Sequence, residues 1–445
     1  MIYKIPFNSK KLINRWAMYD WANSAFALVI TAAIFPTFFT NVSRKVAGVG
    51  LNAKEAYINI FGFNIESNAL YSYALAFAFL LMMIMSPLLS GIADAEGLKK
   101  RMMKIFCYLG ACASFGLLFF DSNYYWVGIV GIILGMIGFN GSIIYYNSFL
   151  PLITTEENYD RVSARGYAYG YLGSVLLLIL NLMMITKPEW FGLDHFENPK
   201  TLACQISFAM VALWWVGFAQ ITFNALPIEP RTADDKINYF KAGFGKLMIA
   251  WKSLKHLPNT RRFLYGFFFC AMALQTIMYI ATLFAKEVIH LEDSETIMMV
   301  LLLQFVGTIG ALLFSRLSSR IGNIKAICIT VIIWIGVCAA AFLVEEKRSF
   351  FIVAAFVGLV MGGLQSLNRS TFSKLIPIKE DELSSYYSFL DVTEKAAITI
   401  GTLSTGLIIS FTGSLRNAIL IYSTCFIIAL YFYARIKLVN KEVIE

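Results

Sequence analysis

Long apolar segments follow one another along most of this chain and constrain its fold more than any other feature. The hydrocarbon core of a bilayer is about 30 Å thick, and an α-helix crosses it with about 20 apolar residues. Twelve such segments are predicted, near residues 16–41, 69–92, 102–121, 124–148, 164–186, 202–226, 262–285, 296–315, 324–344, 350–374, 385–411 and 415–436. Hydrophobic residues make up 58% of the chain and charged residues only 15%, against about 25% charged residues in soluble domains. The sequence therefore predicts an all-α membrane protein with twelve transmembrane helices.

The distribution of Lys and Arg indicates how these helices are oriented. On the predicted spans, most of the 37 Lys and Arg residues fall at the amino end, in the even-numbered loops, at the centre and in the tail. Because positively charged loops remain on the cytoplasmic side, both termini are expected in the cytoplasm, with a bacterial inner membrane as the location. The formal net charge of +9 fits an anionic inner leaflet. The lipid bilayer is therefore the expected surrounding, and no nucleic-acid partner is expected.

The apolar signal stops near the middle of the chain, where the sequence becomes strongly basic. We predict three parts: a first six-helix half (1–226), a cytoplasmic linker (227–261) and a second six-helix half (262–445). Within the linker, apolar residues recur three and four positions apart, which is typical of an amphipathic helix on a membrane surface. They are Ile237, Phe240, Phe244, Leu247, Trp251 and Leu254. This helix either only supports the bundle or regulates it through lipid or a docking partner.

Two stretches recur in both halves and indicate an internal repeat. SGIADAEGLKK, from Ser90, aligns with SRLSSRIGNIK, from Ser315, and this alignment pairs Gly97 with Gly322. FLPLITTEEN in the first half likewise aligns with FSKLIPIKED in the second. Two copies of one six-helix unit that both begin in the cytoplasm are related by an axis along the membrane normal. This is the plan of the major facilitator fold, in which the substrate site lies near the midplane between the halves.

Three longer motifs carry a resemblance to a family. They are RWAMYDWANSAFALVITAAIFP, YYNSFLPLITTEENYDRVSARGYAYGYLGS and GGLQSLNRSTFSKLIPIKEDELSSYYSF. They resemble the major facilitator branch that includes the autophagy-related vacuole effluxers and their bacterial relatives, once called the unknown major facilitator family. The resemblance implies the major facilitator fold and export of amino acids or similar small metabolites.

The eleventh span departs from the pattern of that family. The family places a Gly-Lys pair followed by a Gly-Pro pair, whereas this chain has Glu394-Lys395 and Gly401-Thr402. Lys395 carries over from the family pattern. Glu394 does not, and Asp391 adds a further carboxylate. We interpret the two acids as signs of a coupling or substrate chemistry that is particular to this chain.

Charged side chains inside the predicted spans are the first candidates for a binding site, because each costs about 2.5–3.5 kcal/mol to insert into a bilayer. Asp391, Glu394 and Lys395 share one face of a helix by their spacing of three and four residues. Arg369, on the preceding antiparallel span, is expected at a depth similar to that of Asp391. A membrane-embedded cluster of two acids and two bases is therefore predicted if these faces meet.

The cluster has two interpretations. In the first, one carboxylate binds a proton, and Lys395 or Arg369 engages the carboxylate of a substrate. In the second, Arg369 pairs with Asp391 and Glu394 with Lys395, and the cluster only holds two helices together. The sequence does not decide between them.

Polar residues in the first and seventh spans are further candidates for substrate contacts. Asp20, Asn23 and Ser24 fall on one face of the first span, which lines the cavity in transporters of this kind. Asp20 lies near the predicted start of its helix, so a role at a cytoplasmic gate is an alternative. In the seventh span, Gln275 and Tyr279 are the corresponding candidates.

A cytoplasmic gate is predicted from three loop residues. Asp94, Arg161 and Arg165 resemble the superfamily's latch, in which an acid after the second span engages the ends of neighbouring helices. In the second copy of the repeat, Ser319 takes the place of Asp94. The latch is therefore predicted on one side of the molecule only.

No other chemistry is indicated by the sequence. His195, His256 and His290 lie in separate predicted loops, so no metal site is expected, and neither a phosphate-binding loop nor a nucleophile elbow is present. No cofactor and no enzymatic activity are therefore predicted. The expected function is secondary transport of a small-molecule substrate by a monomer, with protons as a possible coupling ion. Export of drugs, sugars or peptidoglycan fragments is one alternative, and a non-transporting scaffold or sensor with this fold is another.

Overall fold

A computed structural model of the 445-residue chain describes residues 2–50, 56–60, 62–228, 239–412 and 414–437. The elements of the first part are α1 (Lys10–Ala25), the π-helical η1 (Phe26–Ile34), α2 (Phe35–Val46), β1 (Tyr57–Ile60), β2 (Phe63–Glu66), α3 (Ser67–Glu96), α4 (Lys99–Gly116), η2 (Leu117–Phe119), α5 (Tyr125–Ser148), α6 (Leu150–Ile153), η3 (Glu156–Asn158), α7 (Tyr159–Thr186), η4 (Pro188–Phe191) and α8 (Pro199–Phe223). The elements of the second part are α9 (Tyr239–His256), α10 (Pro258–Glu287), α11 (Asp293–Ile321), α12 (Asn323–Leu343), α13 (Lys347–Leu375), α14 (Leu383–Thr412) and α15 (Leu415–Ala434).

Eleven helices of the described chain are long and apolar enough to cross a membrane, and the first of them runs without a break from α1 through η1 to α2. The predicted span that is not among them is the eleventh, which corresponds to α14; this helix has 30 residues but carries Asp391, Glu394 and Lys395 in its first half. The predicted all-α membrane fold is therefore confirmed. One short antiparallel hairpin, β1–β2, was not predicted.

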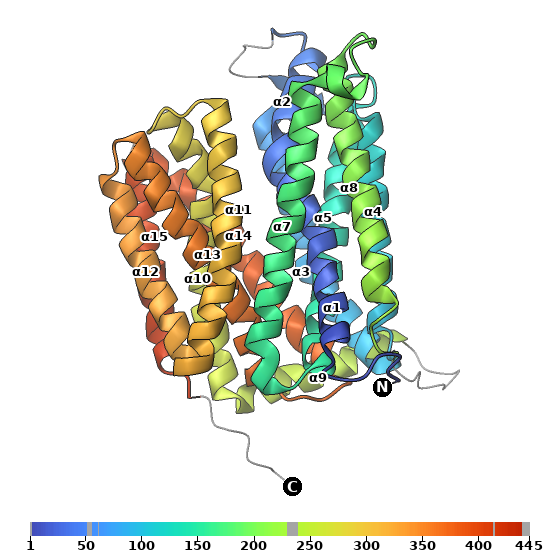
Figure 1. Ribbon diagram of the computed structural model, residues 1–445, viewed down its shortest axis with the longest axis vertical. Helices are drawn as coiled ribbons and strands as arrows, with labels where there is room; N and C mark the ends of the chain where they lie inside the picture. The colour runs from blue at the N-terminus through green and yellow to red at the C-terminus, as the bar shows by residue number, and fades with distance from the viewer. Residues whose placement is uncertain (1, 51–55, 61, 229–238, 413, 438–445) are drawn as a thin grey trace.

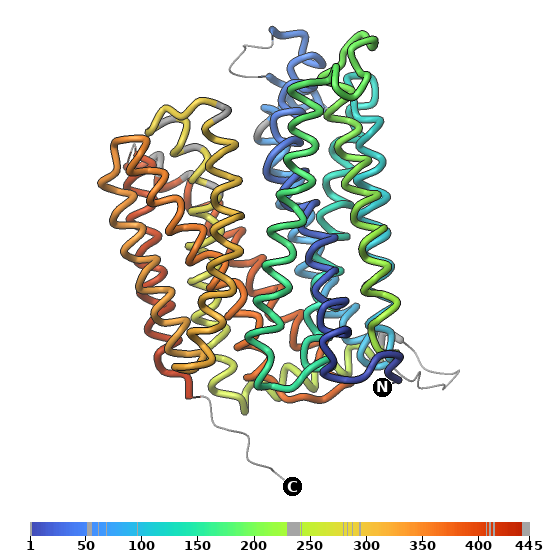
Figure 2. The backbone as a smooth tube through the Cα atoms, in the orientation of Figure 1, coloured from blue at the N-terminus to red at the C-terminus, as the bar shows by residue number. Residues whose placement is uncertain are grey.

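The helices form two groups that lie side by side (Figure 1). The first helix group contains α1 to α8 and the second contains α10 to α15, with α9 beneath them at the end where the N-terminus lies. We call this end the α9 end. The groups approach each other at the α9 end and diverge toward the opposite end, and the antiparallel paths of neighbouring helices are visible in Figure 2. The predicted domain boundaries stay a prediction, because residues 229–238 of the linker lie outside the described residues.

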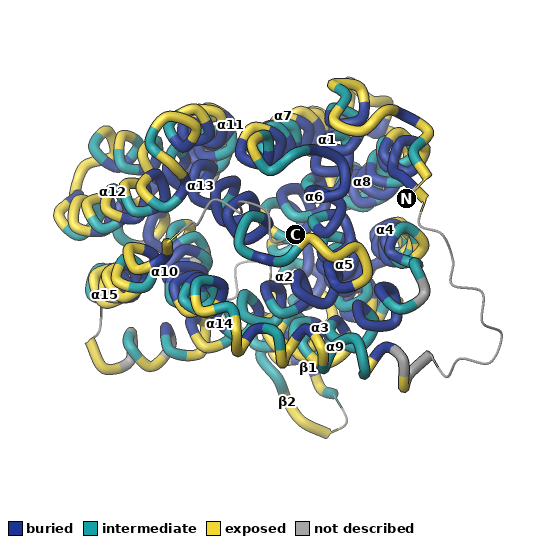
Figure 3. Tube along the Cα trace, turned by 90° about the horizontal axis from the view of Figure 1, so that it is seen from below, coloured by how far each residue is buried: buried dark blue, intermediate teal, exposed yellow. Residues whose placement is uncertain are grey.

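Burial follows the pattern expected of helices in lipid. Buried residues face the interior of each group and the contact between the groups, whereas exposed residues line the outside of the molecule (Figure 3). Many exposed side chains are large and apolar, including Leu80, Ile84, Leu213, Ile332 and Leu403. Exposed apolar surface of this extent marks contact with a membrane or a partner, and its place on long apolar helices fits contact with lipid.

The predicted repeat coincides with equivalent turns in the two groups. Gly97 ends α3 with φ of 65°, and Gly322 lies between α11 and α12 with φ of 88°. Glycine is favoured at both turns because side chains rarely adopt these left-handed angles. Glycine turns at equivalent positions of the two groups support an internal duplication of the six-helix unit.

A helix, α9, lies within the predicted linker, and its amphipathic role stays a prediction. Its backbone packs directly on α3, since a Cβ atom on Gly91 would lie 2.2 Å from the carbonyl oxygen of Gly243. Leu254 is buried, whereas Phe244 and Trp251 are largely exposed. Of the other predicted apolar positions, Ile237 and the side chain of Phe240 lie outside the described residues.

Candidate functional site

Arg369 of α13 forms an ion pair with Asp20 of α1 across the contact between the two groups. Its Nη1 donates to Asp20 Oδ2 at 3.0 Å and to Asn147 Oδ1 at 3.3 Å. Its Nε donates to the hydroxyl of Ser163 at 2.9 Å, and its Nη2 donates to the Ser163 carbonyl oxygen at 2.7 Å. The hydroxyl of Tyr146 donates to the same Asp20 oxygen at 2.9 Å. The buried charges are therefore paired and hydrogen-bonded, as buried charges require.

Three aromatic rings surround the same guanidinium group. The Arg369 Cζ atom lies 4.2 Å from the ring centre of Tyr167, 5.0 Å from that of Trp16 and 5.5 Å from that of Tyr146. These distances permit cation–π attraction. Every one of these partners belongs to the first helix group, so Arg369 is a side chain of the second group inserted into the first.

A second charged cluster lies on α14. Lys395 Nζ is 3.3 Å from Asp391 Oδ1 and 3.3 Å from Glu394 Oε2. The hydroxyl of Ser86, on α3, donates to Asp391 Oδ2 at 3.4 Å, and Gln275 Nε2, on α10, donates to Glu394 Oε1 at 3.4 Å. The side chains of Asp391 and Lys395 are 8% and 5% exposed, whereas that of Glu394 is 31% exposed.

The predicted pairing of Arg369 with Asp391 is wrong. Arg369 pairs with Asp20 instead, because α13 packs against α7 and turns this side chain toward the first helix group. The predicted pairing of Glu394 with Lys395 is present. The structure therefore contains two charged clusters on different helices where the sequence predicted one.

The polar face of the first span, formed by Asp20, Asn23 and Ser24, packs against α7. A Cβ atom on Gly170 would lie 2.5 Å from Ser24 Oγ, so α7 approaches this face of α1 closely. Asn23 is buried, and its Nδ2 atom has no hydrogen-bond partner in the described part of the chain. Directly beyond these residues the helix changes to the π-helical η1, a distortion that is frequent at functional sites. In the seventh span, Gln275 reaches Glu394, while the side chain of Tyr279 lies outside the described residues.

Asp94 joins the two groups at the α9 end. Its carboxylate accepts from the backbone N–H groups of Ser384 and Ser385 at 3.0 and 2.7 Å, in the first turn of α14. It also accepts from the Ser385 hydroxyl at 2.8 Å and lies 3.3 Å from Lys99 Nζ. Lys99 in turn donates to the carbonyl oxygen of Glu380. A carboxylate in this position satisfies N–H groups that the helix itself leaves free.

The two arginines of the predicted gate lie elsewhere. Arg165 donates to Asn14 at 2.6 Å, a contact within the first helix group. Arg161 is exposed and makes no hydrogen bond or ion pair with the residues that the structure describes. Asp94 is therefore the one member of the predicted trio that is placed between the groups.

Asp160 is a bridging residue that the sequence interpretation missed. Its carboxylate accepts from Ser318 at 2.8 Å, from Asn323 at 2.6 Å and from Lys374 at 2.9 Å, all in the second helix group. The expectation of a latch on one side only is therefore wrong. Asp94 lies at the end of α3, the second long helix of the first half, and Asp160 lies at the start of α7, the fifth long helix of the same half. The position equivalent to Asp160 in the second half is the start of α14, which is the helix terminus that Asp94 contacts. This equivalence could have indicated Asp160.

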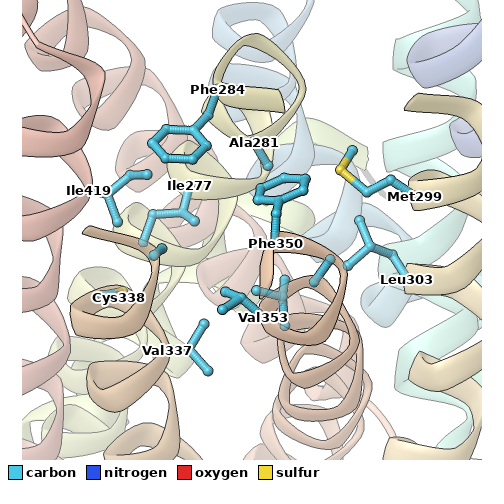
Figure 4. A pocket seen from close by; sticks show the side chains of 13 residues that line it. Ile277, Ala281, Phe284, Met299, Leu303, Val337, Cys338, Phe350, Val353 and Ile419 are labelled. Atoms are coloured by element: carbon cyan, nitrogen blue, oxygen red, sulfur yellow. The ribbon is translucent and has the colours of Figure 1, made fainter. Parts of the chain in front are cut away.

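A small apolar cavity lies inside the second helix group, away from the charged clusters. It is lined by side chains of α10 to α13 and α15, among them Phe284, Met299, Leu303, Val337 and Phe350 (Figure 4). Its volume is about 40 Å³, which is room for a few water molecules rather than for a metabolite. It lacks the polar groups that a charged solute needs.

The fold and its embedded charges define a transporter of the major facilitator type. Solved structures of such transporters share the arrangement. The fucose:proton symporter of E. coli has a TM-score of 0.68 at 16% identity, covering 95% of this chain and 97% of that chain. The human organic anion transporter MFSD10 has a TM-score of 0.69 at 11% identity, covering 95% and 98%. Identities this low show the fold alone.

The chain belongs to the vacuole effluxer Atg22-like family, whose sequence profile matches residues 8–443. One relative is an uncharacterized MFS-type transporter, YxiO, of Bacillus subtilis (strain 168), 27% identical over 427 residues and covering 95% of this chain and 94% of its own. Another is autophagy-related protein 22 of Kluyveromyces lactis, 26% identical over 464 residues, covering 93% and 91%. The family resemblance stated from the motifs is therefore confirmed.

Proposed function

We propose that this chain is a monomeric secondary transporter that exports amino acids or similar small polar metabolites across a bacterial inner membrane by alternating access. The observation that carries the proposal is the α14 cluster, in which two carboxylates and one ammonium lie together on the eleventh predicted span, at the contact between the groups. Charges in this position are costly and serve transport pathways in membrane proteins. A zwitterionic solute requires groups of both signs, and Asp391, Glu394 and Lys395 supply them.

The conformation supports alternating access with the α9 end in the cytoplasm. Hydrogen bonds that join the two groups cluster near this end, at Asp94, Asp160, Ser163 and Arg369. The groups diverge at the opposite end (Figure 1). With the orientation predicted from the Lys and Arg distribution, this arrangement corresponds to the outward-facing state. The Asp20–Arg369 pair then closes the path to the cytoplasm, which favours the gate interpretation of Asp20.

Uptake measurements in proteoliposomes test the proposed function. Vesicles loaded with an unlabelled amino-acid mixture should accumulate labelled amino acids by counterflow, whereas vesicles loaded with unlabelled sugars should not accumulate labelled sugars. Lys395→Ala should abolish counterflow, because it leaves two carboxylates without their shared cation. Lys347→Ala, which removes an exposed lysine paired with Glu295, is the matched control and should retain it. Counterflow of sugars but not of amino acids would contradict the substrate class, and full activity of Lys395→Ala would remove this cluster from the mechanism.

A further inference from the structure

Three lysines gather at the α9 end of the first helix group, away from the contact between the groups. Lys100 and Lys104 lie one turn apart at the start of α4, and Lys4 lies in the segment that precedes α1. Two backbone hydrogen bonds between Ile2 and Ile228, of 2.8 and 2.9 Å, attach this segment to the chain that follows α8. The N-terminus therefore lies at the outer edge of the molecule beside α4 and α8 (Figure 3).

The three ammonium groups have no counter-charge among the described residues. The charges of Lys104 and Lys4 both act on Lys100, and none of the three lysines forms an ion pair with a described carboxylate. Lys100 Nζ donates to the carbonyl oxygen of Leu226 at 2.9 Å, which is a neutral partner. Like charges four residues apart on a helix destabilise it. An anion bound among these lysines would therefore be stabilising.

The lysines border a polar seam between α4 and α8. Lys104 Nζ lies 5.5 Å from the ring centre of Phe223, at the end of α8. Tyr108, one turn further along α4, packs edge-on against the same ring, and its hydroxyl donates to Gln220 Oε1 at 3.4 Å. Tyr108 is exposed, so the seam opens to the outside of the molecule rather than to the contact between the groups.

The depth of the seam selects a lipid rather than a soluble anion. Lys100 lies two residues before the start of the predicted span 102–121, and Lys104 lies two residues after it. Both are therefore placed at the boundary between the hydrocarbon core and the headgroup region, which extends about 5–7 Å beyond the core on each side. Toward the hydrocarbon core, Ile105 and Phe115 of α4 are exposed. A phospholipid carries a phosphate and apolar chains in one molecule and so matches both parts of this surface.

We propose that the seam between α4 and α8 binds one anionic phospholipid of the leaflet at the α9 end, with its phosphate held by Lys4, Lys100 and Lys104. The ammonium groups donate to the phosphate oxygens, and the acyl chains follow the outer face of α4. Basic pockets between membrane helices bind anionic headgroups in this way. The site lies outside the path between the two groups, and the proposal does not depend on the proposed transport function.

Native mass spectrometry of the purified, delipidated protein tests the site. With phosphatidylglycerol and phosphatidylcholine added in equal amounts, the wild type should retain one phosphatidylglycerol molecule in preference. Lys100→Gln combined with Lys104→Gln should lower this retention about tenfold or more, whereas the same two residues changed to Arg should keep it. The matched control is Lys187→Gln combined with Lys200→Gln, two exposed lysines at the opposite end, which should bind as the wild type does. Equal retention by the wild type and the Lys100→Gln, Lys104→Gln variant would overturn the proposal.

Thermal unfolding separates the headgroup from a soluble anion and from a folding defect. Phosphatidylglycerol should raise the melting temperature of the wild type but not that of the Lys100→Gln, Lys104→Gln variant. Without added lipid, this variant should melt at or above the wild-type temperature, because the changes remove repulsion between ammonium groups. Inorganic phosphate should leave the wild-type melting temperature unchanged. If it stabilised the protein as much as phosphatidylglycerol does, the ligand would be a soluble anion and the assignment to lipid would be wrong. Neither measurement involves transport, so failure here is distinguishable from failure of the proposed function.

Discussion

Because Arg369 is inserted into the first helix group, a substitution at this single residue should weaken the contact between the two groups. A guanidinium group donates to Asp20, Asn147 and Ser163 at once because its donors form a rigid planar fork. A lysine can keep the charge but cannot reach all three partners. Each hydrogen bond to a charged group contributes about 1.5–3 kcal/mol, so the loss should be measurable.

We therefore predict that Arg369→Lys lowers the melting temperature of the protein in detergent. The conformation in which the two groups are joined at the α9 end loses hydrogen bonds in this variant. The control is Arg348→Lys, an equally conservative change at an exposed position, which should leave the melting temperature unchanged. Equal melting temperatures for Arg369→Lys and the wild type would show that the fork geometry contributes nothing.

Individual residues also show which contacts could be predicted from sequence. The contact of Lys395 with Asp391 follows from a spacing of four residues on one helix, and the structure contains it. The partner of Arg369 could not be predicted, because Asp20 lies 349 residues away and helical periodicity does not say which faces of two groups meet. Asp160 was missed because an acid in the first turn of a helix is ordinarily explained by the helix dipole.

At the scale of elements, α9 connects the two groups through two contacts of unequal strength. On α3, Gly91 and Gly243 allow direct backbone contact. Toward α14, Lys246 pairs with Asp381 in the preceding loop, and Trp251 lies 5.6 Å from the ring of Phe389. The ion pair is largely exposed, and pairs of this kind contribute about 0–1 kcal/mol.

We predict that Gly243→Val detaches α9 from α3, whereas Asp381→Asn only loosens its contact with the second group. The added side chain must displace the backbone of α3, and overpacking of this kind costs about 1–3 kcal/mol. Hydrogen exchange of the α9 amides should therefore accelerate strongly in Gly243→Val and slightly in Asp381→Asn. The reverse order would contradict the assignment of the stronger contact.

A strongly acidic pH should have the same small effect on hydrogen exchange in α9 as Asp381→Asn. The hydrogen bond from Lys246 lowers the pKa of Asp381 below its ordinary value. Its contribution is thus fully present above the unfolded pKa of about 3.9 and is lost as the pH falls through the lower folded pKa. At neutral pH the pair contributes fully, so its effect on exchange in α9 should not change with pH there, and exchange should rise only under strongly acidic conditions.

At the scale of the whole molecule, the two acids at the α9 end hold the groups together on both sides. Asp94 and Asp160 bond to different helices of the second group, α14 in one case and α11, α12 and α13 in the other. Separate sites usually contribute additively. Their combined removal should shift the molecule toward the state that is open at the α9 end.

This shift can be measured at the opposite end. In a cysteine-free background, spin labels at Glu189 and Glu345, which are both exposed, report the distance between the first and second groups there. Asp94→Asn combined with Asp160→Asn should shorten this distance, and each single change should shorten it less. An unchanged distance in the double variant would show that these carboxylates do not determine the conformation.

The overall architecture was more predictable than its interfaces. Apolar length and the Lys and Arg distribution predict the spans, and the repeat around Gly97 and Gly322 predicts the twofold organisation. The hairpin β1–β2 was not predicted, because a short strand pair beside long apolar helices adds little to the sequence pattern. Contacts between the groups depend on the relative rotation of whole bundles, which local sequence does not encode.

The bond between Asp94 and the first turn of α14 has a consequence for the transport cycle. The amides of Ser384 and Ser385 receive their acceptor from another part of the chain, so separation of the groups leaves them without it. A helix that loses its terminal acceptor frays. The change between the two orientations of the transporter would then include a local unwinding and rewinding of the first turn of α14. Slow hydrogen exchange at these two amides would mark the conformation in which the α9 end is closed.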